Sequence, residues 1–242
     1  MTLNIKLKPK KKVDLVRVGR KNDGGYLVAK KSLVNSKNLI SYGINDDWSF
    51  EKDFLRKNKK VNLKAVDDNL SFTFLLKRLV MNFFWIFSLR KKSNFLYSIY
   101  NLIDYLFSFN KHIIKKTVFY GDTKNISTNL NDIFFKIDIE GSEYRVLNEL
   151  LEIQDKIEGL VIEFHYVDIL SEKIVEFINN FDLELVHIHP NNYGKKDFLG
   201  DPVSIELTFA RNFDIIDGEV EIPNELDMKN NPDADEIILK FN

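Results

Sequence analysis

Residues 132–138 read Asp-Ile-Phe-Phe-Lys-Ile-Asp, and they limit the choice of fold more than any other segment. A β-strand turns alternate side chains to opposite faces of its sheet. A strand that is apolar at nearly every position is therefore buried on both faces, as in a parallel sheet with helices on each side. We expect this segment to be the central strand of an α/β fold.

Similar short apolar runs recur along the chain, and amphipathic stretches separate them. This alternation predicts βα units around a mostly parallel sheet of seven strands. The other six strands are expected at residues 39–43, 61–66, 117–120, 159–164, 183–188 and 203–209, with an additional edge strand at 236–241. Helices are expected at residues 48–57, in the segment after Glu143, and after a cap at Ser171.

The length of 242 residues suits a single domain with two elaborations. Residues 71–109 contain 12 aromatic residues, so we predict a helical insertion over 70–112. Such helices must bury their apolar face, which favours a lid or a homodimer interface, whereas the flanking basic residues also permit peripheral membrane contact. The longest near-apolar stretch, 79–89, is too short to span a bilayer. Residues 214–242 are acidic and are expected to form a peripheral tail.

Charge and composition exclude several classes of function. The net charge of -1 provides no field that would attract nucleic acid, so no nucleic-acid partner is expected. Without cysteine the chain has no disulfide, thiolate nucleophile or cysteine-bound zinc, which fits a reducing compartment. Residues 1–12 are rich in lysine and lack the apolar stretch of an export signal. We therefore expect a cytoplasmic protein.

Candidate binding residues follow the predicted strands, because open α/β sheets bind ligands at the carboxyl ends of their strands. Gly43 ends the first run, and Asp67 follows it by 24 residues, close to the spacing at which an acidic side chain reaches a ribose. Each feature alone also fits an ordinary loop. The glycine fingerprints of dinucleotide and triphosphate sites are absent from the sequence, which favours an adenosine cofactor without phosphates.

Residues 135–143 read Phe-Lys-Ile-Asp-Ile-Glu-Gly-Ser-Glu, and Val146-Leu147 follow them. This segment resembles the K-I-D-x-E-G-x-E motif of FkbM-type methyltransferases. Weaker similarity at residues 17–26, 42–51 and 161–165 extends the resemblance over 13–213, apart from the insertion. Two departures are the single glycine of the 43–47 loop and the 54 residues that separate Asp67 from Gly121.

The resemblance implies a Rossmann-like methyltransferase fold, S-adenosylmethionine as cofactor, and O-methylation of a sugar hydroxyl in polysaccharide or nucleotide-sugar biosynthesis. Asp138 would face the transferred methyl group. The other cofactor contacts would be Gly43, Ile44, Asn45 and Asp46 at the methionine end, Asp67 and Asp68 at the ribose, and Gly121 and Asp122 at the adenine edge. Asp23, Tyr26 and Glu140 would contact the carbohydrate or nucleotide-sugar acceptor.

Catalysis by direct methyl displacement needs a group that removes the acceptor proton. His165 is the first candidate for this base, with a structural histidine as the alternative. Asp138, His165 and His189, or Asn191 in place of His189, would also suit a divalent cation such as Mg²⁺ or Mn²⁺. Asn191 and Asn192 have amide groups that could bind sugar hydroxyls, although the same loop also fits a simple turn.

Two other functions remain open at this stage. A nicotinamide-dependent sugar oxidoreductase or epimerase would share the sheet, but it would need a phosphate-binding glycine loop. A non-catalytic binding module with this fold would use the aromatic insertion as its interaction surface.

Overall fold

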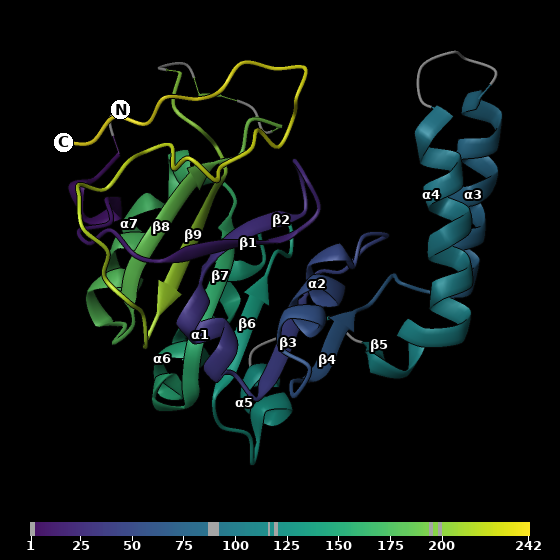
Figure 1. Ribbon diagram of the computed structural model, residues 1–242, viewed down its shortest axis with the longest axis horizontal. Coiled ribbons are helices and arrows are strands. Elements are labelled where there is room, and N and C mark those ends of the chain that lie inside the picture. The colour runs from purple at the N-terminus through teal and green to yellow at the C-terminus, as the bar shows by residue number, and fades with distance from the viewer. Residues whose placement is uncertain (1–2, 87–91, 116, 119–120, 194–195, 198–199) are drawn as a thin grey trace.

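The computed structural model describes residues 3–86, 92–115, 117–118, 121–193, 196–197 and 200–242. Its centre is a seven-stranded sheet in the order β5-β4-β3-β6-β7-β9-β8 (Figure 1). The strands are β3 (Asn38–Tyr42), β4 (Asn62–Asp67), β5 (Ile113–Lys115), β6 (Ile133–Ile137), β7 (Ile157–Phe164), β8 (Glu184–Pro190) and β9 (Ile205–Ala210). Only β9 pairs antiparallel with its neighbours among these strands. The predicted Rossmann-like α/β fold with a mostly parallel sheet is confirmed.

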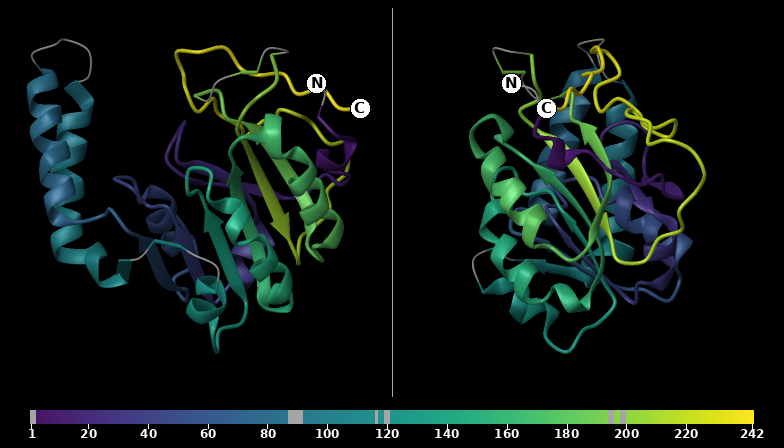
Figure 2. Two further views of the ribbon diagram at one scale, coloured as in Figure 1. Left: turned by 180° about the vertical axis from the view of Figure 1, so that it is seen from behind. Right: turned by 90° about the vertical axis from the view of Figure 1, so that its left-hand side faces the viewer.

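Both faces of the sheet are covered (Figure 2). One face carries α1 (Lys30–Asn35), α2 (Ser49–Lys57) and the hairpin of β1 (Leu15–Gly19) and β2 (Gly25–Ala29). The other carries α5 (Asp122–Ser127), α6 (Leu147–Glu152) and α7 (Val167–Asn180). All five residues of β6 are buried, as its sequence predicts for a central strand.

Some predicted elements differ from the structure. A strand was expected at 117–120, but the strand that pairs with β4 is β5, which begins four residues earlier. Residues 117–118 form no strand, and residues 119–120 lie outside the described residues. Thr117 instead hydrogen-bonds Asp68 (2.7 Å). Helix α7 begins before Ser171, because Tyr166 (φ 57°) reverses the chain directly after β7. The expected edge strand at 236–241 is reduced to one bridge between Leu3 and Phe241.

The insertion forms a helical hairpin between β4 and β5, and it stands beside the sheet (Figure 1). It comprises α3 (Phe72–Ile86) and α4 (Lys92–Asp104), followed by short turns over Tyr105–Phe109 and Asn110–His112. Its base is anchored to α2. Trp48 stacks on Phe109 with ring centroids 4.8 Å apart and donates its indole N–H to Asp104 (2.6 Å). Among the described residues, no helix is long and apolar enough to cross a membrane.

The tail, residues 214–242, runs without regular helix or strand over the end of β8 and β9 (Figure 1). Two of its side chains, Asn230 and Ile237, are buried. Asn230 donates to Glu206 of β9 at 2.6 Å. The backbone of Leu3 also donates to Lys240 at 2.8 Å, so the two ends of the described chain lie together. The tail therefore forms part of the wall of the sheet's carboxyl edge.

Candidate active site

The order of strands reverses between β3 and β6, because the chain continues from β3 to β4 on one side and from β6 to β7 on the other. Open α/β sheets bind ligands at such a switch point, outside the carboxyl ends of the strands. Gly43 and Asp138 directly follow β3 and β6. The sequence therefore placed both candidates at the correct end of the sheet.

Gly43 adopts φ 75°, a backbone conformation that residues other than glycine rarely adopt. A Cβ at this position would lie 1.6 Å from the backbone oxygen of Asp138. The buried ammonium of Lys136 donates to the Gly43 carbonyl at 2.6 Å. The glycine thus permits the loops after β3 and β6 to touch, whereas the sequence suggested close approach to a ligand.

Asp67 fastens the Gly43 turn to the end of β4. Its Oδ2 accepts from the backbone N–H groups of Ile44 and Asn45, each at 2.9 Å. Its Oδ1 accepts from those of Asn69 (2.8 Å) and Leu70 (2.7 Å). Four backbone donors therefore occupy the carboxylate predicted to bind the ribose. The neighbouring Asp68 is exposed.

The loop after β3 is also held by the insertion. Arg78 of α3 pairs with the carboxylate of Asp46 at 2.8 Å, and Asn101 of α4 donates to the Asp46 carbonyl at 2.5 Å. The Tyr97 hydroxyl donates to Asp47 at 2.7 Å. Asp46, predicted to contact the cofactor, is thus engaged by the hairpin.

Gly121 and Asp122 start α5. Gly121 (φ 90°) donates its backbone N–H to Glu149 at 2.7 Å, and Asp122 is buried. Among the described residues no atom lies within 4 Å of a Cβ built on Gly121, so the space above it is open.

Asp138 lies beside two groups that can stabilise its negative charge. The Tyr26 hydroxyl donates to Asp138 Oδ2 at 3.1 Å, and Lys136 Nζ lies 3.6 Å from the same oxygen. Burial would lower the pKa of Lys136, but the charges of Asp138, Glu51 and Glu163 outweigh it and raise that pKa. Burial, followed by the charge of Asp138, raises the pKa of Tyr26. Lys136 is therefore a buried cation and Tyr26 a neutral donor.

His165 is oriented by a buried carboxylate. Its Nδ1 lies 2.9 Å from Glu143 Oε1, which also accepts from the backbone N–H groups of Ile139 and Gly141. A carboxylate only accepts, so Nδ1 carries a proton and Nε2 of the neutral ring is the basic atom. Burial lowers the pKa of His165, but Glu143, Asp138 and Glu140 outweigh it, and the net shift is upward.

Asp138, Glu143 and His165 each offer one ligand atom within 4.8 Å of the others. Two members of the predicted metal set, Asp138 and His165, therefore lie together, and the third residue near them is Glu143, whereas His189 or Asn191 was expected. Strand β9 lies between β7 and β8, so β8 is three strand spacings from β6, or about 14 Å. Ligands of one Mg²⁺ or Mn²⁺ lie only about 2 Å from the ion.

His189 also lies away from the predicted catalytic centre. His189 is buried, with 2% of the residue exposed. Its Nδ1 lies 3.7 Å from Glu206, and its Nε2 lies 3.7 Å from Glu236 of the tail. Burial lowers its pKa, but Glu206, Asp227 and Glu236 outweigh it and raise the pKa. We assign His189 to the contact between sheet and tail.

The two asparagines of the loop after β8 differ. Asn191 is buried and donates to Glu163 at 2.7 Å. Asn192 exchanges hydrogen bonds with the backbone of Asn231 (2.9 and 2.7 Å), so it holds the tail and is not free to bind a sugar. The exposed Glu140 (φ 53°) lies 3.5 Å from His165 Nε2. Half-buried Asp23 lies near Asp138, whose charge adds to burial in raising the pKa of Asp23.

Glu163 and Glu206 belong to the same buried group of carboxylates but were not predicted. Burial raises the pKa of Glu163 well above its usual range, and Asp138 and Glu206 raise it further. The signal in the sequence is an acidic residue flanked by apolar residues within a strand, as in Ile162-Glu163-Phe164 and Ile205-Glu206-Leu207. Charged residues are rarely buried without a partner or a function.

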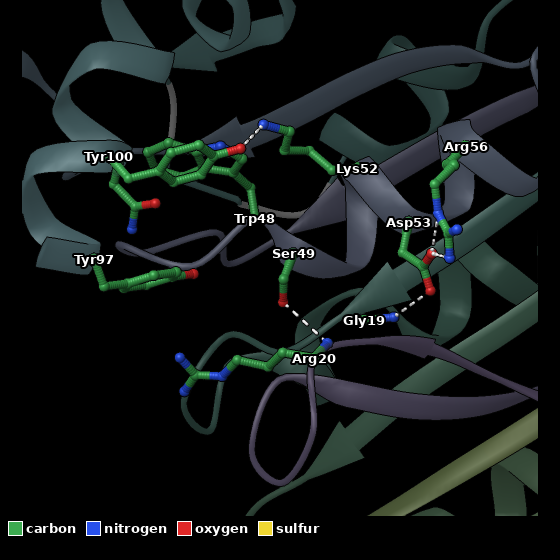
Figure 3. A pocket seen from close by; sticks show the side chains of 10 residues that line it. Gly19, Arg20, Trp48, Ser49, Lys52, Asp53, Arg56, Tyr97 and Tyr100 are labelled. Carbon is green, nitrogen blue, oxygen red and sulfur yellow. Dashed lines mark hydrogen bonds and ion pairs between the residues drawn. The ribbon is translucent and has the colours of Figure 1, made fainter. Parts of the chain in front are cut away.

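A pocket of about 520 Å³ opens between the turn after β1, the start of α2, and α4 (Figure 3). Tyr97 and Tyr100 extend into it from α4, and Lys52 donates to the Tyr100 hydroxyl at 2.5 Å. Arg20 lies opposite Tyr97 and pairs with Asp47 at 2.9 Å. The other lining residues are Gly19, Trp48, Ser49, Asp53, Arg56 and Asn101. Aromatic faces thus alternate with hydrogen-bonding groups.

No protein-family model matches the chain, and no curated protein matches it. Among solved structures, the chain is similar to M. capricolum TrmK in complex with S-adenosyl-homocysteine, at 14% identity and a TM-score of 0.36 over 76% of this chain and 66% of that one. It is similar to precorrin-6y C5,15-methyltransferase from Geobacter metallireducens at 11% identity and a TM-score of 0.39, over 75% and 84%. Small RNA methyltransferase HEN1 matches at 9% identity and a TM-score of 0.41, over 77% of this chain and 25% of that one.

Proposed function

We propose that this chain is an S-adenosylmethionine-dependent O-methyltransferase, as its resemblance to FkbM-type enzymes implies. The observation that carries the proposal is the convergence of three strand ends at the switch point. Asp67 of β4 binds the backbone of Ile44 and Asn45, and the loop of Asp138 contacts Gly43. This is the position at which α/β sheets bind adenosine-containing ligands.

Two features of the edge fit an adenosyl ligand. The exposed carboxylate of Asp68 follows β4 and accepts one side-chain donor on each oxygen, from Asn69 and Thr117, so each oxygen can still accept from a ribose hydroxyl. Each oxygen of Asp67 already accepts from two backbone N–H groups. The open space above Gly121 can take an adenine ring. We therefore assign the ribose contact to Asp68 and a supporting role to Asp67.

When bound, S-adenosylmethionine would supply an electrophilic methyl group to the acceptor oxygen by direct displacement, with S-adenosylhomocysteine as the leaving product. Nε2 of His165 accepts the hydroxyl proton, and Glu143 stabilises the resulting imidazolium through Nδ1. Asp138, held by Tyr26 and Lys136, presents a negative oxygen to the same region.

A divalent cation is an alternative means of activating the acceptor hydroxyl. Asp138, Glu143 and His165 would be its ligands, and Oε2 of Glu143 is buried with no hydrogen-bond partner among the described residues. A cation bound to Nε2 of His165 would prevent that atom from accepting the hydroxyl proton, so the two mechanisms exclude each other. Full turnover after treatment with excess chelator would exclude the cation, whereas loss restored by Mg²⁺ or Mn²⁺ would exclude the free base.

A sugar acceptor is supported by the pocket between α2 and α4. The faces of Tyr97 and Tyr100 can pack on a sugar ring, and Ser49 and Asn101 offer hydrogen bonds to its hydroxyls. Arg20, which lines this pocket, donates to the Asp23 carbonyl at 2.6 Å, and the carboxylate of Asp23 is close enough to Asp138 for the charge of Asp138 to add to burial in raising the pKa of Asp23. We propose that the acceptor extends across the turn that includes Asp23 toward His165.

Isothermal titration calorimetry tests the cofactor assignment. We expect heat with S-adenosylmethionine and S-adenosylhomocysteine, and none with NAD. Asp68→Asn should weaken binding by roughly tenfold or more, because hydrogen bonds to a charged group contribute about 1.5–3 kcal/mol. Asp182→Asn, at another exposed aspartate, is the matched control. Heat with NAD alone would favour the oxidoreductase, and cofactor binding without methyl transfer to a broad glycan panel would favour a binding module.

A further inference from the structure

We propose that the hairpin of α3 and α4 binds the surface of an anionic lipid bilayer with its exposed apolar side chains in the interface. Of the 22 large hydrophobic residues that are exposed in the described part of the chain, twelve lie between residues 72 and 107. They are Phe72, Leu76, Val80, Met81, Phe83, Phe84, Trp85, Leu96, Tyr100, Ile103, Leu106 and Phe107. A helix of a water-soluble protein normally exposes polar residues instead.

The exposed residues form stripes with helical spacing. Leu76, Val80 and Phe83 follow one another at intervals of four and three residues on α3. On α4, Leu96 and Ile103 lie seven residues apart, which is two helical turns, whereas Tyr100 of the same helix lines the pocket. Such a pattern usually marks a face that packs against something apolar, and patches of this extent are rare on isolated proteins.

The two helices do not cover these stripes by packing together. Their mutual contact includes Phe83 of the α3 stripe against Phe95 (centroids 5.6 Å apart) and the hydrogen bond from Asn82 to Ser98 (2.6 Å), yet Phe83 is still 44% exposed. Phe84 is still 63% exposed and Leu96 70% exposed. The apolar surface therefore remains after the hairpin has formed.

The charge of residues 69–103 indicates that the apolar partner of the hairpin is an anionic membrane. Residues 69–103 contain five of the 35 basic residues and none of the 36 acidic ones, so the rest of the chain has six more acids than bases. Basic residues beside exposed Phe, Trp and Leu are typical of helices that lie in the interface of anionic membranes. The acidic body would be repelled, and the hairpin stands away from it (Figure 1).

The dimensions favour an interfacial position. Helix α3 has 15 residues, which corresponds to about 22 Å, shorter than the roughly 30 Å of a bilayer core. A second copy is a poorer occupant of this surface. A symmetric dimer would bring the same face of each copy together, and each face belongs to a segment with bases and no acids.

Binding to lipid would also orient the switch point, because Arg78 and Asn101 hold the loop that contains Asp46. Methyl transfer is not required for the inference, so either proposal can fail alone.

Co-sedimentation with vesicles is the direct test. We expect the full chain to sediment with vesicles of phosphatidylcholine mixed with phosphatidylserine, to stay in solution with phosphatidylcholine alone, and to dissociate partly at high salt. Trp48 is 2% exposed and Trp85 is 48% exposed, so a blue shift of tryptophan emission should come from Trp85 and disappear in Trp85→Phe. Failure to sediment with the anionic vesicles, or equal binding to both kinds, would overturn the proposal.

Variants separate a specific surface from general stickiness. Phe84→Ser with Leu96→Ser should weaken vesicle binding by roughly a hundredfold, since burial of each apolar side chain contributes about tenfold or more. Ile169→Ser on α7 removes an equally exposed side chain (73%) and should change nothing. A dimer in analytical ultracentrifugation that the double variant abolishes, without vesicle binding by either protein, would show that the surface joins two copies and that the proposal is wrong.

Discussion

Replacing Gly43 with Ala tests whether the contact between the loops after β3 and β6 determines the stability of the site. The new Cβ would stand 1.6 Å from the Asp138 oxygen, and real Cβ contacts are essentially never below 3.0 Å. One of the two loops must therefore move. The backbone at φ 75° would add strain of about 1–2 kcal/mol in any case.

The movement has a further cost that can be assigned to particular bonds. The Gly43 turn is fixed by the bonds from Ile44 and Asn45 to Asp67, and losing hydrogen bonds to a charged group costs about 1.5–3 kcal/mol. Adding the backbone strain gives a loss of about 3–5 kcal/mol in the free energy of unfolding. That is a large fraction of the stability of an ordinary domain, about 5–15 kcal/mol.

Urea denaturation of Gly43→Ala and Gly200→Ala measures this difference. Gly200 has a similar φ of 86°, but no atom of the described residues lies within 4 Å of a Cβ built there. Gly200→Ala should therefore lose only the strain, about 1–2 kcal/mol. Equal losses in the two variants would refute the close contact, and retention of S-adenosylhomocysteine affinity by Gly43→Ala would refute a cofactor site at this turn.

Three further changes are expected to act on separate parts of the site. His165→Gln should lower turnover by about 10²–10⁴-fold with unchanged S-adenosylhomocysteine affinity, and a parallel loss of affinity would argue for a structural histidine. The pKa of His189 is raised in the folded state, so protonation of His189 stabilises the fold. This stabilisation is complete below the ordinary pKa of about 6.5 and is lost as pH rises through the pKa of the folded state. Urea unfolding across this range should show stability falling with pH, and the fall should be less steep in His189→Gln. Asn192→Ala should cost about 1–3 kcal/mol and make the tail sensitive to limited proteolysis, whereas an unchanged digest would mean that other contacts hold the tail.

Residue patterns along single strands predicted the sheet well. Residues 132–138 are apolar at nearly every position, and β6 is the buried strand beside the switch point. The hairpin of β1 and β2 was missed, although all five residues of β2 are buried. Its two strands read Leu-Val-Arg-Val-Gly and Gly-Tyr-Leu-Val-Ala, and the turn between them contains Asp23-Gly24, a dipeptide typical of hairpin turns. The signal for this hairpin was therefore present in the sequence.

The order of the strands across the sheet could not be deduced from the sequence. Asp138 follows β6 and His189 is the penultimate residue of β8, and both strands end at the same edge, so the two residues were assigned to one centre. The antiparallel strand β9 is the last in sequence, yet it lies between β7 and β8 and separates the two residues. Glu143 was read as an anion at a helix start, but the chain reversal at Glu140 and Gly141 brings its carboxylate to His165.

The insertion explains the long spacing between Asp67 and Gly121. The 53 residues between Asp67 and Gly121 contain a hairpin that leaves the end of β4 and returns in β5, the neighbour of β4 in the sheet. Because its two ends are adjacent, the hairpin adds mass without disturbing the pairing of β4 with β3. Its base then contacts Asp46, Asp47 and Trp48 of the loop that follows β3. Any partner that displaces the hairpin must therefore also move this loop, so occupancy of the hairpin and binding at the switch point should be thermodynamically coupled.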